Sequence, residues 1–323
     1  MLDPAATQGT AHMSASELKS EFLRVLTDRE TGGIVAAPTT SLPEQFGGSR
    51  NWDYRFCWLR DASLTLEALL QCGYQDETTL WRNWLLRAVA GDPEDMQIMY
   101  AVDGSRNLPE RVLSHLGGYE DSRPVRIGNE AAGQLQTDVL GEVMVALDLA
   151  RQQGPEDSPE SWVLQLALVR NLCEHWTEPD NGLWEFRNQL RYFTHSRVMV
   201  WVAFDRAIKA VEQQWLQGPV QKWRELRSKV YAEVMARGYN DEKGCFTQHY
   251  DTTEVDASLL LLPSVGFIPA DDPRFLGRSG PSSRSFCATA SCCATVPMLA
   301  WTAWPVMSIR SWPVPSGWSL PTP

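Results

Sequence analysis

Residues 50–66, RNWDYRFCWLRDASLTL, combine aromatic, arginine and aspartate side chains at the start of an apolar helix. Within this run, Trp58 is followed directly by Leu59, Arg60 and Asp61. Carbohydrate rings present apolar C–H faces to aromatic side chains and hydroxyl edges to charged hydrogen-bonding groups, so this run supplies both kinds of contact. It favours a sugar pocket. The alternative is an amphipathic helix start that contains an ordinary ion pair.

A second run with chemical potential is PDNGLWEFR, residues 179–187. Residues 180–182, Asp-Asn-Gly, predict a turn, after which Trp184 places an indole beside the carboxyl group of Glu185. Burial against an aromatic ring raises a carboxyl pKa because it disfavours the charged form, and a raised pKa makes Glu a proton donor near neutral pH. Glu185 is therefore a candidate general acid. The alternative is a surface Glu that follows a turn.

The composition predicts a globular protein with neutral ligands. The chain has 323 residues, of which 43% are hydrophobic, and this is ample for a buried core. Its net charge of -11 argues against nucleic acid and anionic membranes as partners, because both repel an acidic protein. Fourteen Trp residues are far more than usual, and sugar-binding proteins often share this feature.

The cysteines and histidines point to neither a disulfide framework nor a metal site. Seven cysteines are an odd number and form no C-x-x-C pair. The five histidines are scattered, and we expect each to be a surface or hydrogen-bonded residue. The first 20 residues lack a basic segment followed by an apolar one, and no run of 18 apolar residues occurs. These features predict a cytoplasmic protein without a metal; they carry no signal for an oligomeric state.

Hydrophobic periodicity predicts an all-α fold built from paired helices. Apolar residues recur at spacings of three and four from position 132 onward, beginning with Leu135, Val139, Val143, Ala146 and Ala150. A further helix is predicted to contain Asp61. Other helical stretches are predicted at 14–26, 76–89, 166–176, 201–211 and 223–234. Residues 91–129 form a long segment without a period, which in a compact domain is usually functional. The absence of a fixed repeat favours a closed helical toroid over a solenoid. For Trp201, Trp215 and Trp223, which lie at or near helical spacing, we expect core positions.

The tail at residues 278–323 differs from the rest of the chain. It contains no Asp or Glu, whereas the preceding 277 residues contain all 40, and it carries seven of the 20 prolines. Proline-rich sequence without a helical period cannot continue the helices. If residues 300–318 are back-translated with allowed codons and the reading frame is shifted back by one base, the new frame can encode MDGLAGDEHPFLACSFWL. We interpret the tail as a frameshift product that is disordered, and resequencing of the gene tests this.

Six runs together resemble the bacterial branch of glycoside hydrolase family 15, which contains glucoamylases and trehalases. They are PTTSLPE, RNWDYRFCWLRDASLTLEALL, SRPVRIGNEAAGQLQTDVLGEV, DNGLWEFR, FTHSRVMVWVAFDRAI and LLLLPSVGFIPADDPRF. The resemblance covers residues 33–277 and implies a partial (α/α)6 toroid. It divides the chain into an N-terminal remnant at 1–32, a catalytic-domain portion at 33–277 and a non-native tail at 278–323.

The resemblance also implies a reaction and a set of site residues. Members of the family hydrolyse α-glucosidic bonds with inversion, using two Glu residues and no cofactor, so a maltooligosaccharide or trehalose is the implied substrate. One Glu protonates the leaving oxygen and the other activates water across a gap of roughly 6.5 to 9.5 Å. By similarity Glu185 is the acid. The implied glucose-binding residues are Tyr54, Trp58, Arg60, Asp61 and Trp184; Gln134, Gln136 and Asp138 lie in a family block without an assigned role.

The sequence departs from the family pattern at both ends. About 30 residues precede the first matching block, where this branch usually has a β-sandwich domain. The general base lies in the last third of the family, and residues 278–323 contain no acid that could serve. We therefore expect an impaired hydrolase. One alternative is a helical protein that binds glucosides without cleaving them; another is an interaction protein in which the candidate site residues do not converge.

Overall fold

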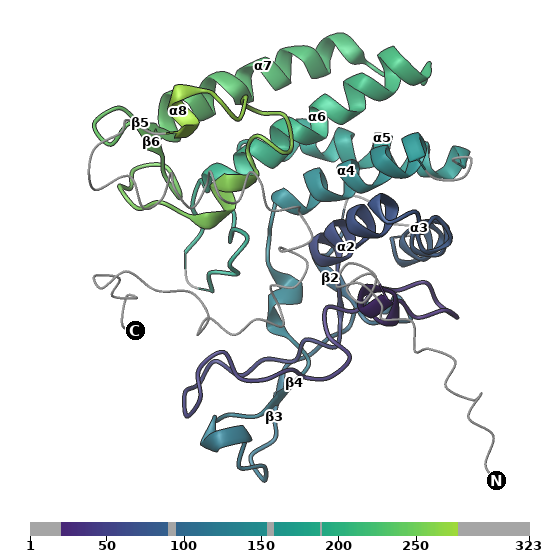
Figure 1. Ribbon diagram of the computed structural model, residues 1–323, viewed down its shortest axis with the longest axis vertical. Helices are drawn as coiled ribbons and strands as arrows, with labels where there is room; N and C mark the ends of the chain where they lie inside the picture. Colours follow the sequence, from purple (N-terminus) through teal and green to yellow (C-terminus); the bar gives the residue numbers. More distant parts are fainter. Residues whose placement is uncertain (1–20, 90–94, 154–157, 188, 277–323) are drawn as a thin grey trace, which may run out of the picture.

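The computed structural model describes residues 21–89, 95–153, 158–187 and 189–276. Three helical pairs dominate these residues: α2 (Leu59–Gln71) with α3 (Asp76–Ala88), α4 (Asp138–Gln153) with α5 (Pro159–His175), and α6 (Thr194–Gln214) with α7 (Val220–Arg237). Helix α4 packs between α2 and α6, and α7 packs on the other side of α6 (Figure 1). This arrangement confirms the predicted all-α class.

The helices follow from local sequence signals and from buried apolar faces. Ser158 caps α5 by accepting a hydrogen bond from the backbone N–H of Ser161, and Pro159 occupies the first helical position, where its missing N–H is not needed. Helix α6 is buried along most of its length, as expected for a helix with neighbours on several sides. On α7 only one stripe is buried, and it consists of the predicted residues Trp223, Leu226, Val230 and Val234.

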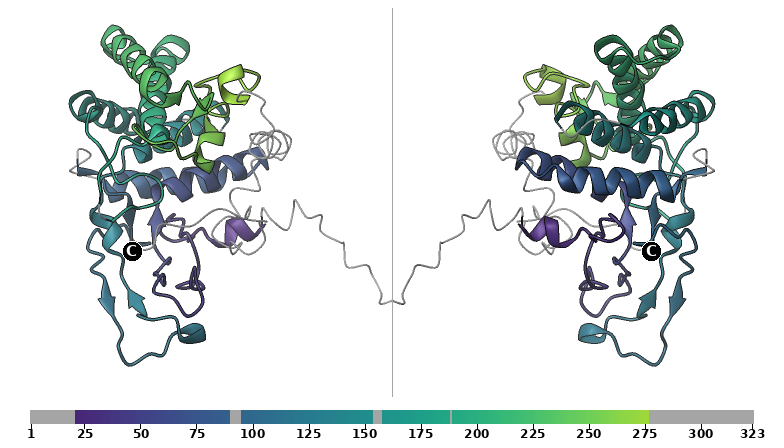
Figure 2. Two further views of the ribbon diagram at one scale, coloured as in Figure 1. Left: turned by 90° about the vertical axis from the view of Figure 1, so that its left-hand side faces the viewer. Right: turned by 90° about the vertical axis from the view of Figure 1, so that its right-hand side faces the viewer.

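The strands are short antiparallel pairs in the connections. Strand β1 (Cys57–Trp58) pairs with β2 (Met99–Tyr100), β3 (Arg111–Val112) with β4 (Arg126–Ile127), and β5 (Tyr239–Asn240) with β6 (Cys245–Phe246). Short helical turns are η2 (Tyr119–Asp121), η3 (Glu130–Gly133), η4 (Ala257–Leu261) and α8 (Pro273–Leu276). The β3–β4 segment projects away from the helices as an arm (Figures 1 and 2).

Two apolar clusters form the core. One lies around α2 and α3 and includes the fully buried Trp81 and Trp84; the other lies around α6 and α7 and includes Phe204 and Trp223. Gly141 allows α4 to approach α6 closely, because a Cβ at this position would overlap the backbone of Met199. None of the helices in the described parts of the chain combines the length and the apolar content needed to cross a bilayer.

Two predicted core positions were wrong. Leu135 is the first residue of the predicted helical stripe, but α4 begins only at Asp138, and Leu135 lies in an extended segment with 43% of its surface exposed. Trp215 ends α6 in a left-handed conformation and is 86% exposed. The remaining residues of the first stripe, Val139 to Ala150, are buried as predicted. The predicted helix at 14–26 is seen as helical residues 21–25, and the tail at 278–323 lies outside the described residues.

Candidate active site

Trp58 and Arg60 meet Glu185 at the N-terminal end of α2. The indole N–H of Trp58 donates a hydrogen bond of 2.7 Å to Oε1 of Glu185, and Nη2 of Arg60 lies 3.8 Å from the same oxygen. Trp58 and Arg60 are buried, whereas the Glu185 side chain keeps 26% of its surface exposed. The predicted side chains therefore converge, which contradicts the interpretation as an interaction protein with separated groups.

The environment of Glu185 favours its protonated form. Burial raises the pKa of this carboxyl group, while the positive charge of Arg60 and the hydrogen bond from Trp58 oppose the rise. The negative charge of Asp61 adds to it. Burial also raises the pKa of Asp61, with Arg60 opposing. The net direction for Glu185 is the one expected of a proton donor.

Arg60 connects Glu185 to the segment at residues 134–138. Its Nη1 donates to Oε1 of Gln136 at 2.8 Å and lies 3.1 Å from Oδ2 of Asp138. The Gln136 amide donates to Oε1 of Gln134 at 3.0 Å, and the Gln134 amide donates to the backbone oxygen of Glu185 at 3.3 Å. In the sequence Q-L-Q-T-D, residues 134–138, the polar side chains of Gln134, Gln136 and Asp138 are two positions apart. This spacing places them on one side of an extended strand and is a sequence signal for their shared location.

Glu185 belongs to a tight loop with an unusual backbone. Its φ is +58°, in the left-handed region that costs a residue with a side chain about 1 kcal/mol or more, and Gly182 has a φ of +66°. The loop is closed by a hydrogen bond from the Glu185 N–H to the Gly182 oxygen and by two between Asn181 and Phe186. These contacts hold Glu185 in a conformation that the chain would not adopt by itself.

Asp180 fastens this loop to the segment before α4. The Thr137 backbone N–H and hydroxyl donate to Oδ2 of Asp180 at 2.9 and 2.8 Å, and the Gly182 N–H donates to Oδ1 at 3.1 Å. Asp180 is 1% exposed, and burial is the largest cause that raises its pKa, to about 6. The predicted turn at 180–182 is thus built on a buried carboxyl group.

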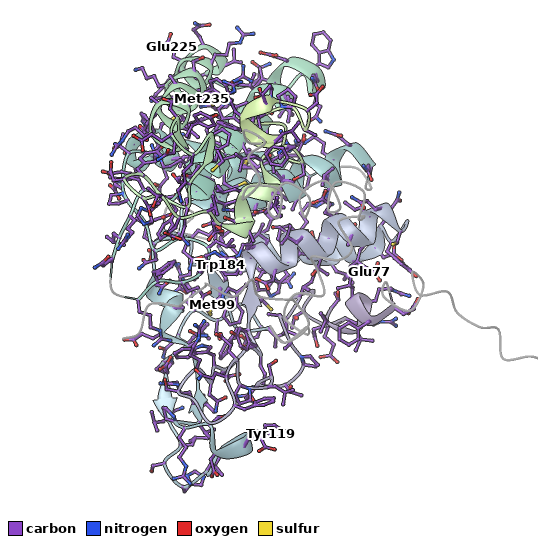
Figure 3. The ribbon with its side chains drawn as sticks, turned by 60° about the vertical axis from the view of Figure 1, so that its left-hand side comes forward. Glu77, Met99, Tyr119, Trp184, Glu225 and Met235 are labelled. Atoms are coloured by element: carbon purple, nitrogen blue, oxygen red, sulfur yellow. The ribbon has the colours of Figure 1, made fainter. Side chains whose placement is uncertain are left out.

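Tyr54 and Trp184 are the remaining aromatic residues of the predicted site. The Tyr54 ring is 5.7 Å from that of Trp58, and its hydroxyl donates to Glu44 at 2.8 Å. Trp184 is 41% exposed, and its indole N–H donates to Oδ2 of Asp256 at 2.7 Å. Figure 3 shows Trp184 near the junction between the helices and the arm. The indole that donates a hydrogen bond to Glu185 is therefore that of Trp58, whereas the indole N–H of Trp184 donates to Asp256. Shielding of Glu185 by Trp184 stays a prediction.

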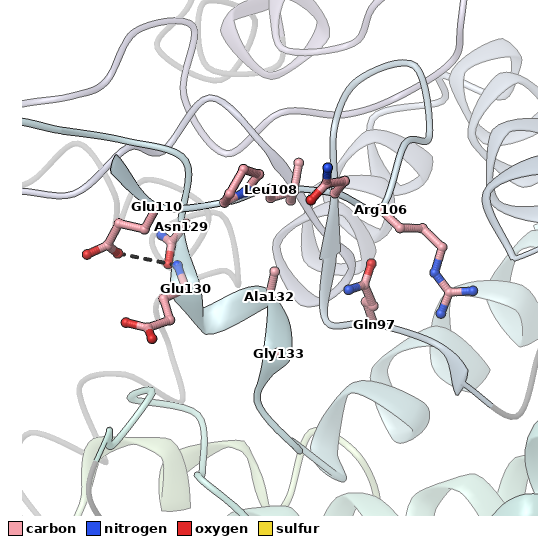
Figure 4. A pocket seen from close by; sticks show the side chains of 10 residues that line it. Gln97, Arg106, Leu108, Glu110, Asn129, Glu130, Ala132 and Gly133 are labelled. Carbon is pink, nitrogen blue, oxygen red and sulfur yellow. Dashed lines mark hydrogen bonds between the residues drawn. The ribbon is translucent and has the colours of Figure 1, made fainter. Parts of the chain in front are cut away.

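A hollow of about 420 Å³ lies next to this site. Its walls include Gln97, Glu110 and Asn129 together with Ala132 and Gly133, the residues immediately before Gln134 (Figure 4). None of the predicted site residues lines it.

The part of the chain that the structure describes holds no group of three or more His, Cys, Asp or Glu side chains arranged to bind a metal ion. His195 departs from the expectation that each histidine is exposed or hydrogen-bonded. It is 3% exposed, and neither ring nitrogen has a hydrogen-bond partner among the described residues. Burial lowers the pKa of His195, which favours the neutral form of its ring.

Comparison with known proteins identifies the family. The sequence model of the glycosyl hydrolases family 15 matches residues 21–287. The chain belongs to this family. It is 42% identical over 255 residues to a trehalase of Mycolicibacterium smegmatis, covering 78% of this chain and 38% of that protein. It is 39% identical over 255 residues to a trehalase of Thermoplasma volcanium, covering 79% of this chain and 41% of that protein.

Solved structures support the fold. A protein described as wild-type glycosidase matches with a TM-score of 0.61 and 17% identity, covering 80% of this chain and 66% of that one. A glucoamylase from Saccharomycopsis fibuligera matches with a TM-score of 0.53 and 14% identity, covering 81% and 58%. The prediction of a partial (α/α)6 toroid is confirmed. The chain spans about two fifths of the length of the two trehalases.

Proposed function

We propose that the chain derives from, and retains the proton-donor half of, a hydrolase of α-glucosidic bonds. Glu185 is the general acid that protonates the leaving oxygen. The observation that carries this proposal is the placement of a half-buried carboxyl group against the Trp58 indole and near Arg60, with its pKa raised mainly by burial.

The remaining predicted residues have roles that fit this reaction. Arg60 and Asp61 bind the hydroxyl groups of the terminal glucose, because a guanidinium donates and a carboxylate accepts hydrogen bonds. Tyr54 and Trp58 cover an apolar face of the ring. Trp184, which is half-exposed and next to Glu185 in the chain, contacts the sugar on the leaving-group side.

Trehalose is the first substrate to test. Its support is the similarity to trehalases, which reaches 42% identity. A maltooligosaccharide is the alternative, since the chain shares its fold with a glucoamylase and a related glycosidase was solved in complex with glucose.

Turnover needs a second carboxylate that activates water, and we propose that residues 278–323 do not supply it, because they contain no Asp or Glu. Loss of general-base activation commonly costs about 10² to 10⁴ in rate. A glucoside-binding protein without hydrolytic activity is therefore the second candidate function.

Two measurements on the purified chain separate these functions. Calorimetry with 1-deoxynojirimycin, a cationic glucose analogue, measures binding, and glucose release from trehalose and maltose measures turnover. We expect binding with little or no turnover. Asp61→Asn should weaken binding at least about tenfold, the equivalent of one hydrogen bond to a charged group, while Glu225→Gln on the exposed face of α7 should not. Failure of the wild-type chain to bind the inhibitor contradicts both candidate functions, and robust glucose release contradicts the proposed impairment.

We further propose that the protein resides in the reducing cytoplasm. The support is that Cys57, Cys72 and Cys173 are free thiols within the described residues. Cell fractionation with an antibody against the chain tests this proposal, and recovery in a secreted fraction contradicts it.

A further inference from the structure

We propose that Gln134 and Gln136 are positioning residues that hold the backbone of Glu185 through a one-directional chain of hydrogen bonds starting at Arg60. The inference rests on the proposed role of Glu185, and it adds two residues to the predicted site.

The direction of the chain follows from the chemistry of its first member. A guanidinium has five N–H donors and no acceptor, so the Arg60 contact at 2.8 Å must be to the oxygen of the Gln136 amide. The Gln136 nitrogen then faces Gln134 and must donate to its oxygen, at 3.0 Å. This leaves the Gln134 nitrogen to donate to the Glu185 backbone oxygen, at 3.3 Å. Each amide orientation is thus fixed by the one before it.

The chain is anchored at its Arg60 end. Asp138, which is fully buried, lies 3.1 Å from the same guanidinium nitrogen and begins α4. Gln136 is 4% exposed, so its amide group is shielded from water that could compete for these hydrogen bonds. Arg60, Gln136 and Asp138 therefore form a fixed base from which Gln134 extends to the loop.

The extended segment 134–137 contacts the Glu185 loop both through side chains and through its backbone. The side chains of Gln134 and Gln136 point to one side, towards Arg60 and the Glu185 carbonyl. The backbone oxygen of Leu135 accepts from the N–H of Asn181 at 2.9 Å. The loop is therefore bound both through its backbone and through the glutamine pair.

A positive φ explains why a separate support is needed at Glu185. A left-handed residue returns to the commoner conformation by rotating its flanking peptide groups, and this rotation moves both its carbonyl oxygen and its side chain. The Gln134 amide fixes that carbonyl oxygen. The consequence is a carboxyl group held at 2.7 Å from the Trp58 indole and 3.8 Å from Arg60.

The test uses the Trp58 indole N–H as a reporter that does not depend on turnover. Its proton resonance in a nitrogen–proton correlation spectrum is assigned as the signal lost in Trp58→Phe. Gln134→Ala removes the last donor, and Gln134→Glu replaces it with an acceptor of nearly the same size. We expect both to move the Trp58 signal towards its position in Glu185→Gln, and Gln134→Glu to weaken 1-deoxynojirimycin binding about tenfold.

Gln134 is the chosen site because it is only partly buried, so its variants should fold, and thermal unfolding checks this. Gln221→Glu, on the exposed face of α7, adds the same charge away from the site and should leave the Trp58 signal unchanged. A Trp58 signal at the wild-type position in both folded Gln134 variants overturns the positioning role. Absence of inhibitor binding in the wild-type chain instead contradicts the proposed function, and the Trp58 signal still tests the hydrogen-bond chain.

Discussion

Trp58 and Glu185 are 127 residues apart in the chain, and a single hydrogen bond of 2.7 Å joins the indole of one to the carboxyl group of the other. Trp58 lies at the β1–α2 junction, whereas Glu185 lies in the loop between α5 and α6. The bond therefore links the first helical pair, α2 and α3, to the loop that precedes the third pair, α6 and α7. It also stabilises the charged form of Glu185, against the larger effect of burial.

Replacing Trp58 with Phe should raise the pKa of Glu185 further, because the substitution removes a donor that stabilises the carboxylate. Inhibitor binding that depends on the ionised carboxyl group should then require a higher pH. Calorimetry of 1-deoxynojirimycin binding across a pH series measures this shift. Trp215→Phe is the control, since Trp215 is 86% exposed. A binding profile that is unchanged in Trp58→Phe contradicts the expected coupling.

Glu142 makes stability depend on pH. It is 5% exposed on α4, and burial, together with the negative charge of Asp138, raises its pKa to about 8 although Arg60 opposes the rise. A carboxyl group whose folded pKa exceeds its unfolded value holds its proton more tightly when folded. The free energy of unfolding should therefore fall as pH rises from the unfolded pKa through about 8, by a few kcal/mol in order of magnitude.

Glu142→Gln should remove this loss, because the amide stays neutral at every pH. Urea unfolding at pH 6 and pH 9 measures the effect, and the variant should be more stable than the wild type at pH 9. Glu225→Gln, an exposed change on α7, should retain the wild-type pH dependence. Parallel pH profiles for Glu142→Gln and the wild type would show that Glu142 does not titrate in this range.

The sequence predicted the helices best where burial and helical period agree. On α7 the residues at spacings of three and four are those that the core covers, so the pattern alone identified them. The pattern failed at Leu135 and Trp215, both of which lie just outside a helix. Hydrophobic spacing cannot locate a helix end, because the end depends on capping and on the packing of the next segment.

The sequence predicted the separate members of the site but not all of their contacts. Trp58, Arg60 and Glu185 converge as the family resemblance implied. The role of Gln134 was not predictable, because its contact with Glu185 depends on the placement of two loops 51 residues apart. Trp184 is adjacent to Glu185 in the chain, but its indole N–H donates to Asp256, and the indole that donates to Glu185 comes from Trp58, 127 residues away.

Asp180→Ala should release the Glu185 loop. The substitution leaves the Thr137 N–H, the Thr137 hydroxyl and the Gly182 N–H without their acceptor in a buried site. We expect a loss of about 3 kcal/mol in the free energy of unfolding and weaker 1-deoxynojirimycin binding. Chemical denaturation and calorimetry measure the two effects. Asp241→Ala, at an exposed position in the β5–β6 turn, is the control, and equal stability of the two variants contradicts the anchoring role.

Gly141→Ala tests the close approach of α4 and α6. A methyl group at this position would overlap the carbonyl oxygen of Met199 and lie 2.8 Å from its Cβ, so the helices must separate. Helix propensity alone predicts the opposite sign, because Ala is favoured over Gly by about 1 kcal/mol. We expect the overlap to prevail and to destabilise the fold by about 2 kcal/mol. Gly133→Ala, where a methyl group meets nothing within 4 Å, is the matched control in urea unfolding. A Gly141 variant as stable as the wild type would mean that α4 and α6 are packed less closely than this geometry requires.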